Sequence, residues 1–126
     1  MKYFALLGRF CYAAIFVMAG PSHFRAATIA YAASQGVPLA SMVVPLSGAM
    51  AILGGLSIAL GYKARWGAWI IALFLVPVTL SMHRFWGLPD PQAAMLQQIM
   101  FMKNLSMLGA ALLITQVGSG PLSVKE

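Results

Sequence analysis

Charge is what this sequence has least of. The chain of 126 residues carries 8 basic and 2 acidic side chains, while 61% of its residues are hydrophobic. Soluble domains carry about 25% charged residues. So few charges cannot build a water-facing surface, so lipid must solvate most of the chain. The net charge of +6 comes from scattered single Lys and Arg residues, which excludes a nucleic-acid patch and favours contact with lipid headgroups.

Cysteine and catalytic motifs are also scarce. The single cysteine, Cys11, lies in an apolar run without a CxxC pair, which excludes an internal disulfide and dithiol exchange within the chain. The P-loop, GxGxxG, HExxH and GxSxG signatures are all missing. Asp90 is the only acid before the C-terminal residue, and one carboxylate without a second acid or a nucleophile does not make a hydrolase.

Long apolar runs fill most of the chain and predict four transmembrane helices, at about residues 3–20, 39–60, 66–82 and 95–116. Arg9 interrupts the first run, which favours a span over a cleaved signal peptide. Residues 23–35 are too few and too polar to span, and they predict a short helix lying at the membrane interface. The sequence therefore predicts an all-α fold, in which residues 1–126 form a single membrane domain, a four-helix antiparallel bundle.

The basic residues predict how this bundle is oriented. One group falls at the same predicted end as the two termini: Lys2, Lys63, Arg65 and Lys125. The other predicted end carries Arg25 and Arg84. By the positive-inside rule the first end is cytoplasmic. We therefore expect a multi-pass protein of the bacterial inner membrane with cytoplasmic N- and C-termini.

Two features predict contacts within the membrane. A stripe of small residues repeats every fourth position in the second span and predicts a helix-packing face: Ser47, Ala51, Gly55 and Ala59. Arg9 is a membrane-embedded cation, which costs roughly 2.5–3.5 kcal/mol on insertion scales. Its side chain is expected either to reach the headgroups or to hydrogen-bond free backbone carbonyls.

Polar residues collect between residues 81 and 104, and topology adds two more from the end of the first span. Together they form a candidate outward-facing polar pocket or quinone contact: His23, Arg25, His83, Arg84, Trp86, Gln97, Lys103 and Asn104. Histidine nitrogens suit a quinone carbonyl, or a metal or haem, but no third ligand is visible and no metal site is predicted. In the alternative interpretation the glutamine, lysine and asparagine join helices and contact lipid, and the histidines are ordinary interfacial residues.

The order and spacing of several short motifs resemble the DoxX family of small four-helix membrane proteins. The first half of the chain contributes Leu7-Gly8-Arg9, Ala19-Gly20, His23-Phe24, Gly36-Val37-Pro38, Gly54-Gly55 and Gly61. The second half contributes Arg65, His83, Phe85-Trp86, Phe101, Lys103-Asn104-Leu105 and Gly109. Two positions depart from the family: the acid that many relatives carry before Gly-Gly is absent, and His23 stands where a lysine is common.

The resemblance implies a link to quinone-reducing sulfur oxidation systems or redox-defence assemblies, and it supplies no agreed catalytic residues. The leading hypothesis is therefore a non-catalytic accessory, anchor or scaffold subunit of a larger membrane redox complex. Alternatives are a quinone-interacting subunit of a membrane oxidoreductase and a small-solute carrier. A carrier would have to oligomerise, because one four-helix unit has no inverted repeat. The expected partners are lipids and other membrane subunits or further copies of this chain.

Overall fold

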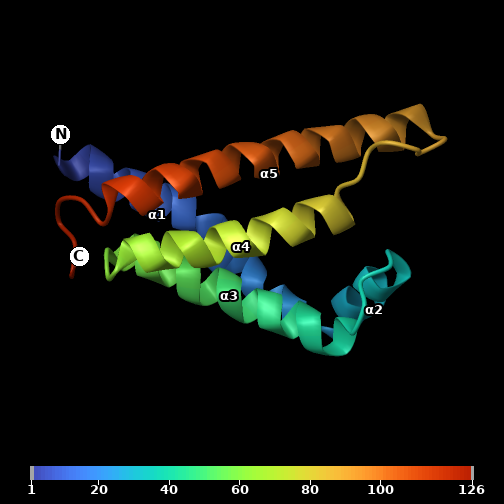
Figure 1. Cartoon of the computed structure of the whole chain (residues 1–126), viewed down its shortest axis with the longest axis horizontal. Helices are drawn as coiled ribbons and strands as arrows, with labels where there is room; N and C mark the ends of the chain where they lie inside the picture. The colour runs from blue at the N-terminus through green and yellow to red at the C-terminus, as the bar shows by residue number, and fades with distance from the viewer. Residues whose placement is uncertain (1, 126) are drawn as a thin grey trace.

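The computed structural model describes residues 2–125, and helices account for most of them, with no strand among them. The elements in chain order are α1 (Lys2–Ala19), the 3-10 helix η1 (Gly20–Phe24), α2 (Ala26–Ser34), α3 (Ala40–Leu60), α4 (Ala64–Met82) and α5 (Pro91–Val117). The N- and C-terminal ends of the chain lie at the same end of the molecule (Figure 1). The all-α prediction is therefore confirmed.

Four helical segments are long and apolar enough to cross a membrane: Lys2–Phe24, Ala40–Leu60, Ala64–Met82 and Pro91–Val117. The last begins four residues before the range expected from hydropathy. Asp90 explains the difference, because its carboxylate accepts a hydrogen bond from the Gln92 backbone N–H at 3.1 Å. Pro91 then occupies the first helical position, where no backbone donor is needed. A cap and a proline thus start this helix within polar sequence.

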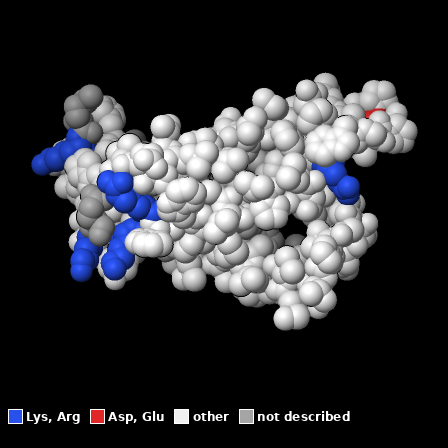
Figure 2. Space-filling view, viewed as in Figure 1, with Lys and Arg blue, Asp and Glu red and all other residues white. Residues whose placement is uncertain are grey.

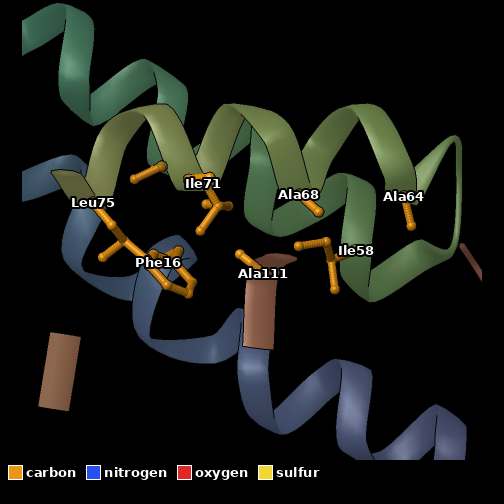
Figure 3. Close-up of a cluster of buried hydrophobic side chains, with 9 residues drawn as sticks. Phe16, Ile58, Ala64, Ala68, Ile71, Leu75 and Ala111 are labelled. Carbon is orange, nitrogen blue, oxygen red and sulfur yellow. The ribbon is translucent and has the colours of Figure 1, made fainter. Parts of the chain in front are cut away.

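Helix α4 lies between α3 and α5, and α1 packs against α3. The main core forms where these four helices meet, and Figure 3 shows its side chains. Ile58 of α3 and Ile71 of α4 are fully buried there, and Leu75 is 1% exposed. Phe16 of α1 and Ala111 of α5 join the same cluster. Small side chains fill much of it, so the helix backbones can approach closely.

The predicted small-residue stripe on α3 lies toward α1 in its middle part. Ala51 is 1% exposed, and a Cβ atom built on Gly55 would lie 3.3 Å from the Ala13 carbonyl oxygen of α1. Ala59 is half-buried, and the Ser47 hydroxyl donates to the Val44 carbonyl of its own helix at 2.6 Å. Within the stripe, Ala51 and Gly55 are therefore buried, whereas Ser47 and Ala59 are half-buried.

The closest helix approaches use glycines outside that stripe. A Cβ atom on Gly54 of α3 would lie 3.0 Å from the Gly67 carbonyl oxygen of α4. A Cβ atom on Gly48 would lie 2.7 Å from the Gly20 carbonyl oxygen of η1. Any larger residue at Gly48 would push η1 away from α3. Glycine at these two positions therefore sets the spacing of α3 from both of its neighbours.

Arg9 is 7% exposed, and its guanidinium binds the segment that follows α5. Its Nη1 donates to the carbonyl oxygens of Ser119 and Pro121 at 2.7 and 2.6 Å, and its Nη2 donates to that of Leu122 at 2.8 Å. Of the two expectations for this cation, hydrogen bonding to backbone carbonyls is the one observed. The buried charge is therefore solvated by the end of the chain.

The same C-terminal segment pairs with the turn between α3 and α4. The Lys125 backbone N–H donates to the Gly61 carbonyl at 2.9 Å, and the Lys63 N–H donates to the Lys125 carbonyl at 2.7 Å. The Ser119 hydroxyl accepts a bond from the Ala64 N–H at 3.1 Å and so satisfies a donor in the first turn of α4. Residues 118–125 therefore cover this end of the helices.

Charge is distributed unevenly along the molecule. Figure 2 shows most of the Lys and Arg side chains at the end where both termini lie, and the acidic side chain at the opposite end. That opposite end is also where the view shows the molecule hollowed.

Candidate functional site

The principal cavity lies between α3, α4, η1 and α2, at the end opposite the termini. Its volume is about 290 Å³, and most of its lining is apolar. The polar side chains on its wall are those of His23, Thr28, Ser47, Ser81 and His83. Apolar walls with a few convergent polar groups are typical of small-molecule sites. This cavity is therefore the candidate functional site.

A second cavity of about 140 Å³ lies between α1, α4 and α5. It shares His23 and His83 with the first and adds the side chain of Asn104. The two histidines, 60 residues apart in sequence, thus line the same pair of cavities, as topology suggested. No group of three or more His, Cys, Asp or Glu side chains within residues 2–125 is arranged to hold a metal ion.

Backbone packing positions His23. The chain turns from α1 into η1 at Gly20 and Pro21, and η1 lies directly on α3. A Cβ atom on Gly48 would lie 2.6 Å from the His23 Cβ atom, so this glycine admits the histidine. The Nδ1 atom of His23 is buried without a hydrogen-bond partner, and the ring contacts that of Phe74, with centroids 5.8 Å apart. His23 is thus a half-buried imidazole held among apolar groups.

His83 follows the last residue of α4, where the helix ends and the chain turns toward α5. Its Nδ1 atom forms a hydrogen bond of 3.0 Å with the side-chain Oε1 of Gln97 on α5. A neutral imidazole whose Nδ1 donates to this oxygen leaves Nε2 as an acceptor. The bond therefore fixes the ring orientation and links the α4 end to α5.

Asn104 joins the same two helices deeper in the molecule. Its side-chain Nδ2 donates to the Thr79 hydroxyl at 3.1 Å, and both residues are buried. Gln97, Phe101 and Asn104 are spaced so as to share one face of α5, and all three are buried or half-buried in the structure. This polar pairing matches the expected interhelical role, while Asn104 also lines the smaller cavity.

Five of the predicted pocket residues line neither cavity, and Gln97, which bonds to His83, is one of them. Arg25 and Lys103 are exposed. The Arg84 guanidinium donates to the Gln35 carbonyl at 2.9 Å and so links the α4–α5 loop to the end of α2. Trp86 is 52% exposed and packs edge-on against Phe101, with ring centroids 5.9 Å apart. These side chains position the loop around the cavity end.

The residues that sequence reasoning missed are mainly the apolar wall. Phe74 and Val78 of α4 line both cavities, and Pro77 lies between them at the mouth of the larger one. The one available signal was Pro77, which cannot donate a backbone hydrogen bond to the Leu73 carbonyl. Apolar residues in an apolar helix carry no mark that separates a cavity wall from a lipid-facing surface.

The arrangement can bind an apolar molecule and offer it hydrogen bonds from imidazole or amide groups. It presents no paired carboxylates and no hydroxyl–imidazole contact among the bonds of the described residues. The apolar wall and its few polar groups are the features of a small-molecule binding site.

Comparison with known proteins adds a family and one relative. The family model described as DoxX matches residues 4–84, which run from α1 to just past α4. The ER-derived vesicles protein ERV29 of Saccharomyces cerevisiae (strain ATCC 204508 / S288c) is 31% identical over 77 residues, which cover 61% of this chain and 24% of that protein. This chain thus matches about a quarter of the length of that relative. No solved structure matches it significantly.

Proposed function

This chain belongs to the DoxX family and is a multi-pass membrane protein, and we propose that it is a non-catalytic membrane subunit that holds an apolar ligand of the quinone class. The observation that carries this proposal is the cavity of about 290 Å³ at which His23 and His83 meet an otherwise largely apolar wall. The family resemblance supports the same ligand class, because members are linked to quinone-reducing systems.

The chemistry of the wall suits a quinone. A quinone ring is flat and apolar and carries carbonyl oxygens that accept hydrogen bonds. His23 has no hydrogen-bond partner within residues 2–125 at its buried Nδ1. His83 donates from Nδ1 to Gln97, so the Nε2 of its neutral ring is an acceptor that can receive a hydrogen bond from the hydroxyl of the reduced quinol form. Two imidazoles in an apolar wall would orient such a ring through its oxygens.

A second candidate function is that of an anchor subunit without a ligand. Helix α5 favours this function, because only 17% of its 18-residue apolar stretch is buried, against 22–39% of the corresponding stretches in the other three spanning segments. Its lipid-facing side would pack against another subunit of a membrane redox complex. Both functions place this protein in a larger assembly, and they differ in whether a quinone copurifies.

The proposal includes an arrangement in the bacterial inner membrane. We place the four spanning helices as an antiparallel bundle and α2 at the outer interface. Four basic residues belong to the segments at the end that carries the termini: Lys2, Lys63, Arg65 and Lys125. That excess of positive charge supports cytoplasmic N- and C-termini and an outward cavity. The third alternative, a solute carrier, is less favoured because residues 118–125 cover the cytoplasmic end.

The experiment is a measurement of bound quinone. The protein is purified from its native membranes in mild detergent, extracted with organic solvent, and its quinone is quantified by mass spectrometry. We expect close to one quinone per chain, and a clear loss of quinone in His83→Ala. The matched control is Lys103→Ala, because Lys103 is exposed and lines neither cavity.

Protein without quinone, or a His83→Ala variant that retains the wild-type amount, would contradict quinone binding. If larger membrane proteins copurify with the quinone-free chain, the anchor function is supported in its place. Orientation is tested separately by fusing a fluorescent protein to the C-terminus, which should fluoresce because the fusion stays in the cytoplasm.

A further inference from the structure

The two cavities share one partition. The residues that line both of them are His23, Phe74, Val78 and His83. Phe74 is half-buried within this group, and its ring lies edge-on to that of Phe16, with centroids 6.3 Å apart. The Phe74 ring also contacts the ring of His23, with centroids 5.8 Å apart. One aromatic side chain thus stands between two spaces inside the helices.

The larger cavity opens toward lipid between α3 and α4. Three of its lining residues are also among the exposed apolar side chains of the molecule: Val43 at 41%, Leu46 at 61% and Leu73 at 64%. In a membrane such residues face acyl chains. A hydrocarbon chain that occupies this cavity could therefore continue into the bilayer without crossing water.

The smaller cavity is lined mainly by α1, α4 and α5, and polar atoms make up a larger share of its wall than of the other cavity's wall. Eleven residues line it, and His23, His83 and Asn104 are among them. The Asn104 amide uses one N–H for the Thr79 hydroxyl, which leaves a second N–H on the same nitrogen. This space offers hydrogen bonds that the apolar mouth between α3 and α4 does not.

The volumes of the two cavities favour a single ligand that occupies both. Small-molecule sites usually occupy about 300–1,000 Å³. The larger cavity, at about 290 Å³, reaches only the lower end of that range, and the smaller one, at about 140 Å³, lies below it. Rotation of the Phe74 side chain would join them into one elongated space with a polar inner part and an apolar mouth.

We propose that Phe74 determines which ligand this site accepts, by gating the passage between the smaller cavity, which binds the ring, and the larger cavity, which binds the hydrocarbon chain. This inference rests on the proposed quinone-class function. The ring of the ligand lies against His23, His83 and Asn104, and its hydrocarbon chain passes Phe74 and leaves between α3 and α4. The site therefore binds a quinone that carries a hydrocarbon chain more tightly than the same quinone ring without that chain.

Two probes separate what the hydrocarbon chain of the ligand contributes to affinity from what the ring contributes. The compound 2,3-dimethoxy-5-methyl-1,4-benzoquinone is the ubiquinone ring without a hydrocarbon chain, and decylubiquinone is the same ring with a ten-carbon chain. Affinities for both are measured by isothermal titration with the full-length protein in lipid nanodiscs, and the ratio of the two Kd values is compared among variants. Wild type should prefer decylubiquinone over the chainless ring after correction for partition into protein-free nanodiscs.

Two substitutions change the passage in opposite directions. Phe74→Trp overfills it and should lower the preference for decylubiquinone about tenfold, because the larger ring obstructs the passage that the hydrocarbon chain must use. Phe74→Leu widens it and should raise the preference about threefold, because less of the population must open before binding. The control is Phe101→Leu, which removes an aromatic ring that lines neither cavity.

The outcomes are distinct. A preference that is equal in wild type, Phe74→Trp and Phe74→Leu overturns the gating role and leaves the proposed function intact. If wild type binds neither probe, both the proposed function and this inference are wrong. If Phe74→Trp does not yield folded protein, Phe74→Leu alone decides, because an unchanged preference in that variant contradicts the gate.

Discussion

The guanidinium of Arg9 in α1 donates a 2.7 Å hydrogen bond to the carbonyl of Ser119, 110 residues later in the chain. Two further carbonyls of the same segment, those of Pro121 and Leu122, complete the contact. Backbone oxygens of residues 119–122 therefore accept hydrogen bonds from both terminal nitrogens of this buried cation, while its Nε has no partner within residues 2–125. The same contact holds residues 118–125 over the α3–α4 turn.

Arg9→Leu should release this segment. The substitution leaves three carbonyls without their charged donor, and hydrogen bonds to charged groups contribute about 1.5–3 kcal/mol each to stability. We expect a loss of about 3 kcal/mol in the free energy of unfolding, and faster hydrogen exchange at the amides of Val124 and Lys125. Arg25→Leu is the control, since Arg25 is exposed. Unchanged exchange in Arg9→Leu would contradict this role.

Gly48→Ala should separate η1 from α3. The new methyl group would lie 2.6 Å from the His23 Cβ atom and 2.7 Å from the Gly20 carbonyl oxygen, so backbone must move. Overpacking of this kind costs about 1–3 kcal/mol. The matched control is Gly109→Ala in α5, where no atom lies within 4 Å of the added Cβ. Thermal unfolding in detergent should show a lower Tm for the first variant and an equal or higher Tm for the second.

Asn104 and Thr79 should show a coupling energy. Their hydrogen bond joins α4 to α5 in the buried interior, and such bonds in membrane proteins average about 0.6 kcal/mol with a maximum near 1.7. A double-mutant cycle with Asn104→Leu and Thr79→Val measures it through the free energy of unfolding in mixed micelles. Strictly additive effects of the two substitutions would show that the bond contributes nothing.

Ser119→Ala should weaken the start of α4. The Ser119 hydroxyl accepts the Ala64 N–H, so it acts as a cap supplied from a distant part of the chain. Loss of a capping hydroxyl costs about 1 kcal/mol. Ser106→Ala serves as the comparison, because the exposed Ser106 hydroxyl only donates to the Met102 carbonyl of its own helix. Equal stability of the two variants would argue against the cap.

Much of the architecture could be predicted from the sequence. Apolar runs with almost no acids require lipid around them, and their lengths fix four spanning helices. Their expected ends agree with the observed helices to within a few residues, and α5 differs most because Asp90 and Pro91 start it earlier. The family resemblance is confirmed over residues 4–84.

The candidate site was predictable only in part. His23 and His83 were expected at the same end because short connections alternate the direction of successive helices, and both line the cavities. Lys103 was grouped with them, yet it is exposed, since one residue of rotation separates it from the buried face of Asn104. Hydropathy has no information about rotation when nearly every face of a helix is apolar.

The sequence by itself determined that this protein is helical, lies in a membrane and keeps its few polar groups for particular contacts, because burial in lipid admits no other backbone structure for these runs. Tertiary structure decided what those groups touch. It brought Arg9 to the carbonyls of residues 119–122, and it put Phe74 between two cavities. Such contacts depend on the rotation and spacing of packed helices, which arise from close approaches at residues such as Gly48 and Gly54 rather than from composition.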